Sequence, residues 1–332
     1  MVTRIALAAA LLLLAVSCTD LTEYDDTYSA GVTSFSIYDL SPGGSIPDIA
    51  GARSLCATSK HLLVATTEGY LESYDPGSLE HTGSYPVGSP SPSGYFFMDH
   101  SRYENSVYLI GAFGQIIEFS ASTLSISDVF SVCESPVAME FMEYEPYYYV
   151  ADFSSSRILE LRAETNGVCR QRTLESSPLC LAMDHTQDTM LVGTTGITEL
   201  LSVGSSGLIY RRAMSDWPRI DAIEAVPNDT TLCTVFEISS SDFRLSLVFR
   251  YFPPYGGGAL WENVDFLPGD MHYLAVDTAG QRAFVLSYEG GDSSLLSGYY
   301  LEDHSLIGEV KVPGYPMDLD CGDNSVYALT IE

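Results

Sequence analysis

The fold is decided by two stretches that share one pattern. The first reads Pro136-Val-Ala-Met-Glu-Phe141, then Tyr147-Tyr-Tyr-Val-Ala-Asp152, then Arg157-Ile-Leu-Glu-Leu161; the second reads Pro178-Leu-Cys-Leu-Ala-Met183, then Met190-Leu-Val-Gly-Thr194, then Gly196-Ile-Thr-Glu-Leu200. They begin 42 residues apart. Each apolar run has the length and alternation of a β-strand, and polar turns separate the runs. The pattern therefore predicts a repeated β-unit.

Further copies of the unit extend in both directions along the chain. They begin near Arg53, Gly94, Ile220 and Tyr273. A last copy contains only two strands, Pro316-Met-Asp-Leu-Asp320 and Ser325-Val-Tyr-Ala-Leu-Thr330. Its two missing strands appear at the other end, as Thr33-Ser-Phe-Ser-Ile-Tyr-Asp39 and Gly44-Ser-Ile-Pro-Asp-Ile49.

Six complete units and one shared between the termini predict an all-β, seven-bladed β-propeller over residues 33–332. Its last blade combines outer strands from the N-terminus with inner strands from the C-terminus. Such sharing closes the ring and removes exposed sheet edges. The alternative, two β-sandwiches, predicts no such period and leaves the terminal half-units unexplained.

The N-terminal segment predicts export. Residues 1–17 carry one charge, Arg4, before an apolar run too short to span a bilayer, as in a signal peptide. Ala15-Val16-Ser17-Cys18 resembles the lipobox of bacterial lipoproteins. The resemblance implies cleavage before Cys18 and lipidation of its sulfur, with residues 18–32 as an acidic, flexible tether. We expect anchoring to a bacterial membrane, inner or outer, on its periplasmic or cell-surface side. An ordinary secretory signal is the alternative.

Charge and cysteine content restrict the partners. The chain has 15 Lys and Arg against 44 Asp and Glu, a net charge of −29. This field repels phosphate backbones and anionic head groups, so we expect no nucleic acid and membrane contact through the lipid alone. It favours cationic ligands or basic partners, although an acidic surface also serves solubility. The six cysteines after Cys18 show no CxxC spacing and predict mostly buried, free thiols, with room for one disulfide.

The repeats resemble the YVTN-type propeller repeats of bacterial exported and surface proteins. The segments that carry the resemblance are Tyr148-Tyr-Val-Ala-Asp152 with Ile158-Leu-Glu-Leu161, and Val107-Tyr-Leu-Ile-Gly111 with Ile116-Ile-Glu-Phe119. The Asn of the family motif is absent. The resemblance implies a propeller, and the family contains both binding proteins and lactonase-like enzymes, so it leaves the activity open.

Two groups of acidic residues recur at equivalent positions. Glutamates recur in the third strand of successive units, at Glu72, Glu118, Glu160 and Glu199. They could bind cations, but different blades would hold them apart. Aspartates end the first strand at Asp99, Asp184, Asp277 and Asp320, and His100 and His185 follow two of them. Turn aspartates commonly accept backbone N–H bonds; acid–base or metal chemistry is the alternative.

The fifth unit contains an insertion from Arg250 to Trp261 that mixes aromatic residues with Gly and Pro. Tyr251, Tyr255 and Trp261 are therefore the predicted ligand-binding residues. No hydrolase elbow, phosphate loop or haem motif occurs, so we predict no catalytic residue, resident metal or cofactor. The sequence favours a monomeric, lipid-anchored binding or scaffold protein for a protein, peptide or glycan. A lactonase-like hydrolase with a metal near the central channel is the alternative.

Overall fold

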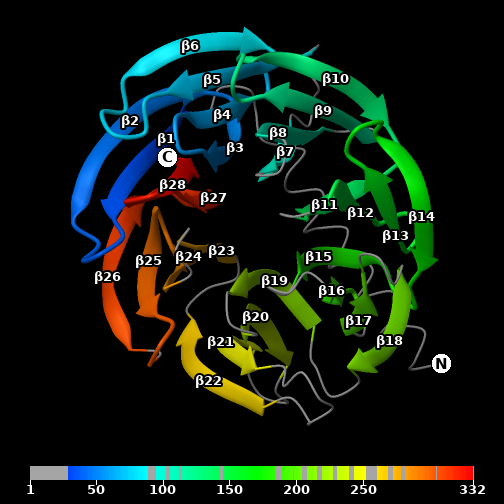
Figure 1. Ribbon diagram of the computed structural model, residues 1–332. Coiled ribbons are helices and arrows are strands. Elements are labelled where there is room, and N and C mark those ends of the chain that lie inside the picture. Colours follow the sequence, from blue (N-terminus) through cyan, green and yellow to red (C-terminus); the bar gives the residue numbers. More distant parts are fainter. Residues whose placement is uncertain are drawn as a thin grey trace, which may run out of the picture.

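The chain forms a ring of β-sheets. The computed structural model describes residues 29–88, 95–101, 105–111, 114–142, 145–183, 189–196, 198–203, 208–214, 219–226, 230–238, 243–251, 260–267, 272–277, 281–303 and 305–331, and the side chains of 210–272 are outside that description. The described strands form seven four-stranded antiparallel sheets around a central axis (Figure 1). The predicted all-β propeller is confirmed.

Each sheet is one blade, with its strands in order from the axis outward. Blades 1 to 3 are β3 (Ala52–Ala57), β4 (Leu62–Thr66), β5 (Tyr70–Tyr74), β6 (His81–Pro86); β7 (Tyr95–Ser101), β8 (Ser106–Gly111), β9 (Gln115–Ser120), β10 (Ser125–Ser131); and β11 (Pro136–Phe141), β12 (Tyr147–Asp152), β13 (Arg157–Arg162), β14 (Gly167–Thr173). Blades 4 to 6 are β15 (Pro178–Met183), β16 (Thr189–Thr194), β17 (Thr198–Ser202), β18 (Ile209–Met214); β19 (Arg219–Val226), β20 (Thr230–Ile238), β21 (Phe243–Tyr251), β22 (Leu260–Leu267); and β23 (His272–Val276), β24 (Arg282–Gly290), β25 (Ser293–Tyr300), β26 (Leu306–Pro313).

Blade 7 closes the ring from both ends of the chain. It consists of β27 (Tyr315–Cys321), β28 (Ser325–Ile331), β1 (Ser29–Ser36) and β2 (Pro42–Ala50). β1 pairs with β28 from Ala30↔Ile331 to Ser36↔Ser325. Inner strands of successive blades then contact one another around the ring, including β27 with β3. The predicted sharing of one blade between the termini is confirmed.

The predicted start of the propeller, Thr33, is too late because β1 begins at Ser29. Ala30 and Val32 are 2% and 0% exposed and pack against Leu329 and Ile331 in one core cluster. Ala30 and Gly31 fall within the predicted tether, and Gly by itself is a weak strand former. Pairing with β28 overrides that local preference.

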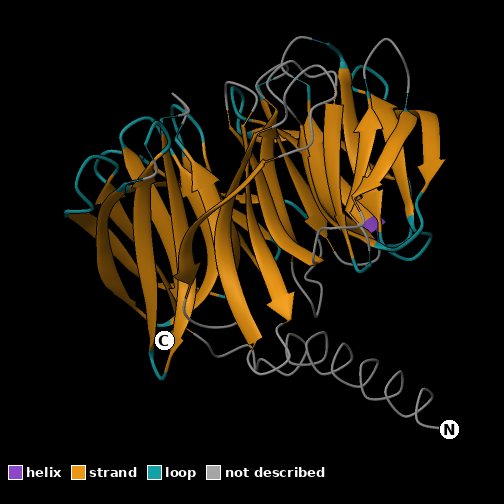
Figure 2. Ribbon diagram, turned by 90° about the horizontal axis from the view of Figure 1, so that it is seen from below, coloured by secondary structure: helices purple, strands orange, loops and turns teal. Residues whose placement is uncertain are grey.

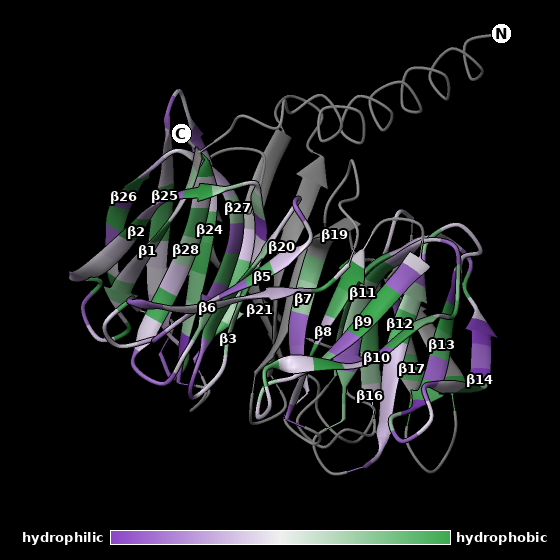
Figure 3. Cartoon of the chain, turned by 90° about the horizontal axis from the view of Figure 1, so that it is seen from above, coloured by the Kyte–Doolittle hydropathy of each residue, from purple (hydrophilic) through white to green (hydrophobic). Residues whose placement is uncertain are grey.

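Burial follows the position of each strand within its blade. The second strands β4 and β8 are buried at every residue, because both faces of the sheet pack against neighbouring blades. The outer strand β10 is exposed at all but one of its positions. The outer strand β14 is exposed or partly exposed along its whole length, and part of it is coloured as hydrophilic (Figure 3). The core is therefore a set of apolar layers between blades.

Six of the seven inner strands contain the same irregularity. The pairing register shifts at the second or third residue of the strand, as between Pro136 and Ala138, Pro178 and Cys180, and Pro316 and Asp318. Such bulges increase local twist, and proline is tolerated there because its missing N–H is not needed by the ladder. This explains why proline leads several units.

The ring has two distinct faces, which are seen edge-on in Figure 2. On the first, the turns between second and third strands bond to the connections between blades: the Thr67 N–H donates to the Gly51 carbonyl and the Gly314 N–H to that of Asp292, both at 2.8 Å. β1 also starts there, beside Ile331. We call this the entry face. The far face carries the other turns.

No helix among the described residues is both long enough and apolar enough to cross a membrane.

Candidate functional site

The inner strands of blades 7 and 1 meet through two carboxylates. Asp318 and Asp320 alternate with buried Leu319, so both project from the same side of β27. Asp318 Oδ2 accepts the Leu55 N–H at 2.8 Å, and Asp320 Oδ2 accepts the Ala57 N–H at 2.7 Å. β3 is the innermost strand of its blade and has a hydrogen-bonded strand on one side only. The two carboxylates therefore accept hydrogen bonds from N–H groups on its open edge, as a neighbouring strand would.

Burial and neighbouring carboxylates shift the ionisation of groups on these inner strands. Burial, with smaller contributions from the negative charges of Asp320 and Asp99, raises the pKa of Asp318 to about 8. Burial followed by the same group of carboxylates raises the pKa of the Cys56 thiol well above its usual range. Cys56 is 1% exposed. It is therefore a protonated thiol at neutral pH, and thiols in that form are poor nucleophiles.

The predicted turn aspartates accept backbone N–H bonds wherever the structure describes them. Asp99 Oδ1 accepts the His100 N–H at 2.6 Å, and Asp320 Oδ1 accepts that of Cys321 at 2.7 Å. Asp277 accepts the N–H of Arg282 at 3.1 Å and also binds the Arg282 guanidinium at 2.8 Å. The structural interpretation is confirmed at these positions. Asp184 and His185 lie outside the described residues.

Two of the recurring glutamates are 1% exposed and bonded within the ring. The Glu160 carboxylate lies 3.3 Å from the Arg170 guanidinium, and burial still raises its pKa. Glu199 accepts the Glu175 N–H at 2.7 Å, and burial raises its pKa as well. These side chains hold their own part of the ring together.

Glu118 links two blades. It lies at the third strand of blade 2, where the Ser106 hydroxyl donates to it at 3.2 Å. The Asn166 side-chain amide donates to it from blade 3, also at 3.2 Å. Among the described residues, no three His, Cys, Asp or Glu side chains are grouped so that they could hold a metal ion.

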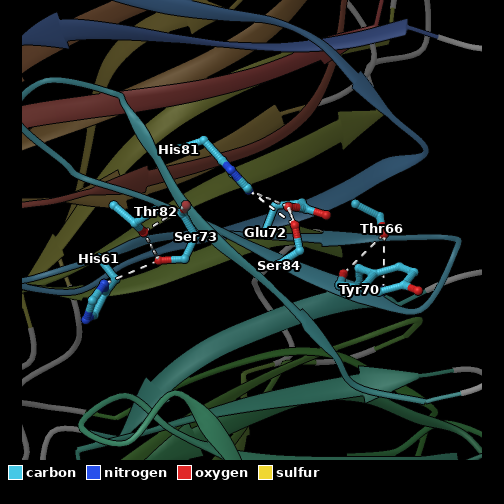
Figure 4. Close-up of polar contacts among 8 residues, drawn as sticks. All are labelled: His61, Thr66, Tyr70, Glu72, Ser73, His81, Thr82 and Ser84. Atoms are coloured by element: carbon cyan, nitrogen blue, oxygen red, sulfur yellow. Dashed lines mark hydrogen bonds and ion pairs between the residues drawn. The ribbon is translucent and has the colours of Figure 1, made fainter.

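Glu72 forms a serine–histidine–carboxylate group with Ser84 and His81 on blade 1 (Figure 4). Glu72 Oε2 lies 2.7 Å from His81 Nε2, and the Ser84 hydroxyl donates to the same oxygen at 2.5 Å. Ser84 lies 3.3 Å from that same Nε2. In a catalytic triad, carboxylate and hydroxyl approach opposite ring nitrogens. Here they share one nitrogen, so His81 is not placed to activate Ser84 as a triad base.

A second polar group lies beside it on the same blade (Figure 4). The Thr82 hydroxyl contacts the buried Ser73 hydroxyl at 2.8 Å, and Ser73 lies 3.3 Å from His61 Nδ1. Burial, and then the charge of Lys60, lowers the pKa of His61, so its imidazole is neutral at pH 7. These contacts join β5 and β6 to the turn before β4.

The cysteines agree in part with the prediction. Five lie among the described side chains: Cys56 and Cys321 are buried, Cys133 and Cys180 are partly buried, and Cys169 is exposed. Cys56, Cys133 and Cys169 are free thiols. The exposed thiol on the outer strand β14 departs from the expectation of buried thiols.

The predicted ligand-binding side chains and Cys18 lie outside the described part of the structure. Tyr251 and Trp261 lie on β21 and β22, whose side chains are outside the description, as are Tyr255 and Cys18 altogether. Sequence reasoning did not single out Asp318 or Tyr38. Tyr38 meets Tyr300 around Arg282 on the far face. Tyr38, Tyr300 and Arg282 lie in the β1–β2 turn, at the end of β25 and at the start of β24, and no local motif connects them.

Comparisons with known proteins support the fold alone. No family model and no curated protein matches this sequence. In structure, it is similar to hydrazine synthase of Kuenenia stuttgartiensis, with TM-score 0.67 and 11% identity over 85% of this chain and 95% of that one. A functionally unknown protein of Desulfotomaculum acetoxidans gives TM-score 0.67 and 10% identity, with 85% and 95% covered. The Cps50 (Swd1) β-propeller domain of Myceliophteria thermophila gives 0.63 and 8%, with 85% and 97% covered.

Proposed function

We propose that this chain is a lipid-anchored β-propeller of a bacterial cell envelope that binds a protein, peptide or glycan through its far face. The observation that carries the proposal is where the chain enters the ring. β1 begins at Ser29 on the entry face, and ten residues (19–28) separate it from Cys18. Fully extended, this segment reaches at most about 35–40 Å. A lipid at Cys18 therefore holds the entry face near the membrane and leaves the far face available.

The rigidity of the ring supports a binding role. Its recurring carboxylates bond to backbone N–H groups, to Arg170 and to neighbouring blades, so the turns start from fixed strand ends. Loops on a rigid scaffold are common binding elements. The acidic charge of the chain favours basic partners.

The anchor is tested with Cys18→Ser in the native bacterium or a bacterial expression host. The wild-type protein should fractionate with membranes and incorporate an alkyne-labelled fatty acid. The variant should be unlabelled, soluble and folded, whereas the matched variant Cys169→Ser should behave as wild type. An unlabelled wild-type protein, or a Cys18→Ser protein that stays in the membrane fraction, would contradict the anchor.

The binding face is tested by site-specific photo-crosslinking in cells. Glu80 and Glu68 are both exposed residues of blade 1, on the far and entry faces respectively. A photoreactive amino acid at position 80 should give a defined crosslinked product that the same group at position 68 does not give. A crosslinked product from position 68 alone would mean that the partner binds the entry face, which would contradict the proposed binding through the far face.

A second candidate, a lactonase-like hydrolase with a metal near the channel, is favoured by Asp318. A carboxyl with a pKa of about 8 remains largely protonated at neutral pH, as a general acid must. This candidate predicts Ca²⁺ or Zn²⁺ in the purified protein and loss of stability with a chelator. Metal-free protein that is equally stable with the chelator would exclude it.

A further inference from the structure

An arginine on the far face is stacked against two exposed tyrosines. The Arg282 guanidinium carbon lies 4.6 Å from the ring centre of Tyr38 and 5.9 Å from that of Tyr300. Tyr38 is 55% exposed and Tyr300 39%. The three residues come from the β1–β2 turn, the start of β24 and the end of β25. We call them the Tyr38–Tyr300 patch.

The patch is held in place from beneath. The Arg282 guanidinium binds the carboxylate of Asp277 at 2.8 Å, and the two side chains are 13% and 1% exposed. The Tyr38 hydroxyl donates to the Asn324 side-chain carbonyl at 3.4 Å. The Tyr300 N–H donates to the carbonyl of Ser305 at 2.9 Å. Because these contacts exist without a partner, the tyrosines lose little conformational freedom on binding.

The surroundings of the patch are negative. Asp277 neutralises the charge of Arg282, whereas exposed carboxylates lie in the β1–β2, β25–β26 and β27–β28 turns of the far face, at Asp39, Glu302, Asp303 and Asp323. Hydrogen bonds from Ser41 lower the pKa of Asp39, so this carboxylate is ionised at neutral pH. Exposed aromatic rings surrounded by carboxylates suit a cation with an apolar stem, which describes the side chains of lysine and arginine.

We propose that the Tyr38–Tyr300 patch binds a cationic, lysine- or arginine-rich segment of a partner protein. This inference rests on the proposed binding function. It adds the chemistry of the partner and the part of the far face to which the partner binds. Lysine and arginine stems lie against the outward sides of the two rings, and their charges approach the carboxylates at the rim. Tyr and Arg side chains are also enriched among residues that dominate protein interfaces.

The test measures binding of a fluorescein-labelled hexalysine peptide to the full-length protein in detergent, by fluorescence anisotropy. The double variant Tyr38→Ala/Tyr300→Ala should weaken binding by about tenfold or more, as for residues that dominate an interface. The control Tyr70→Ala removes a tyrosine that is 42% exposed on the entry face, and binding should remain within about twofold of wild type. Melting curves and the milder pair Tyr38→Leu/Tyr300→Leu, which keeps apolar bulk but no ring, separate loss of binding from loss of folding.

A charge comparison distinguishes a site from the general acidic field. Glu302→Gln should weaken peptide binding more than Glu68→Gln, which removes an exposed carboxylate from the entry face. Equal effects of these two variants, or unchanged binding in both tyrosine pairs, would overturn the patch. Suppose that the peptide tests contradict the patch. A partner product from photo-crosslinking at position 80 would then mean that the patch is wrong while the proposed binding function stands. The absence of that product as well would contradict both.

Discussion

Asp318 Oδ2 accepts a hydrogen bond from the backbone N–H of Leu55 at 2.8 Å, although the two residues are 263 positions apart in the chain. The bond joins blade 7, which both termini build, to blade 1. Asp320 and Ala57 form the same kind of bond beside it at 2.7 Å. The pairing of β1 with β28 completes blade 7, and these two carboxylates bond its inner strand β27 to the inner strand β3 of blade 1.

Replacing Asp320 with alanine should destabilise the ring at this seam. The Ala57 N–H would lose its acceptor in a partly buried position, which costs about 1–3 kcal/mol. Asp320→Asn keeps an acceptor oxygen and should recover most of this loss. The free energy of unfolding from denaturant titration measures both. Asp323→Ala, an exposed carboxylate in the next turn, is the control and should change stability little; an equal loss there would refute the role of the seam.

Asp318 should make stability depend on pH. An unfolded aspartate has a pKa of about 3.9, whereas burial raises the pKa of Asp318 to about 8. Between these values the folded state holds a proton that the unfolded state has released, so this group lowers stability as pH rises from about 4 to about 8. Asp318→Asn removes the contribution and keeps the acceptor for Leu55. Relative to wild type, the variant should gain at least ~1 kcal/mol in free energy of unfolding between pH 5 and pH 8. A pH-independent difference would contradict the raised pKa.

Removing Arg170 should expose the cost of burying Glu160. The Glu160 side chain is 1% exposed, and Arg170 is the cation beside it at 3.3 Å. We expect Arg170→Ala to lower stability by about 1–3 kcal/mol at pH 8, less than for a fully buried pair because Arg170 is half exposed. The loss should shrink near pH 4, where Glu160 is protonated. Adding Glu160→Gln should restore stability; if the double variant remained as unstable as Arg170→Ala, the uncompensated charge would not be the cause.

Gly314 should tolerate no side chain, in contrast to Gly290. Both have positive φ, 90° and 97°, so alanine introduces similar backbone strain at each. A Cβ on Gly314 would lie against the carbonyl of Ile331 on the entry face, whereas a Cβ on Gly290 meets nothing within 4 Å. Gly290→Ala should cost about 1 kcal/mol and Gly314→Ala clearly more. Thermal melting of the two variants compares them directly, and equal melting temperatures would mean that blade 7 relaxes around the new methyl group.

Much of the fold was predictable because it repeats. Strand length and alternation depend on local composition, so the stretches after Pro136 and Pro178 predicted their strands closely. The truncated copy at the C-terminus predicted blade 7. The predicted boundary at Thr33 was wrong for a tertiary reason, since the residues from Ser29 to Val32 form a strand by pairing with β2 and β28.

The sites were less predictable, because their members come from different blades. The aspartates near the ends of inner strands could be recognised as acceptors of backbone N–H bonds from their local position, and the structure agrees at Asp99, Asp277 and Asp320. Asp318 could not be distinguished from its neighbours, because its high pKa arises from burial and from the charges of Asp320 and Asp99 on inner strands of the ring. Tyr38 and Tyr300 carry no shared motif, and only the ring places both beside Arg282.

The sequence by itself therefore determined the all-β repeat, the sharing of one blade between the termini and the acidic charge, since each follows from composition and spacing along the chain. Only the tertiary structure decided which carboxylates are buried, which join neighbouring blades, and which aromatic side chains remain exposed together. The physical reason is that burial and charge proximity depend on distances in space. In a closed ring, residues separated by more than two hundred positions lie within hydrogen-bonding distance of one another.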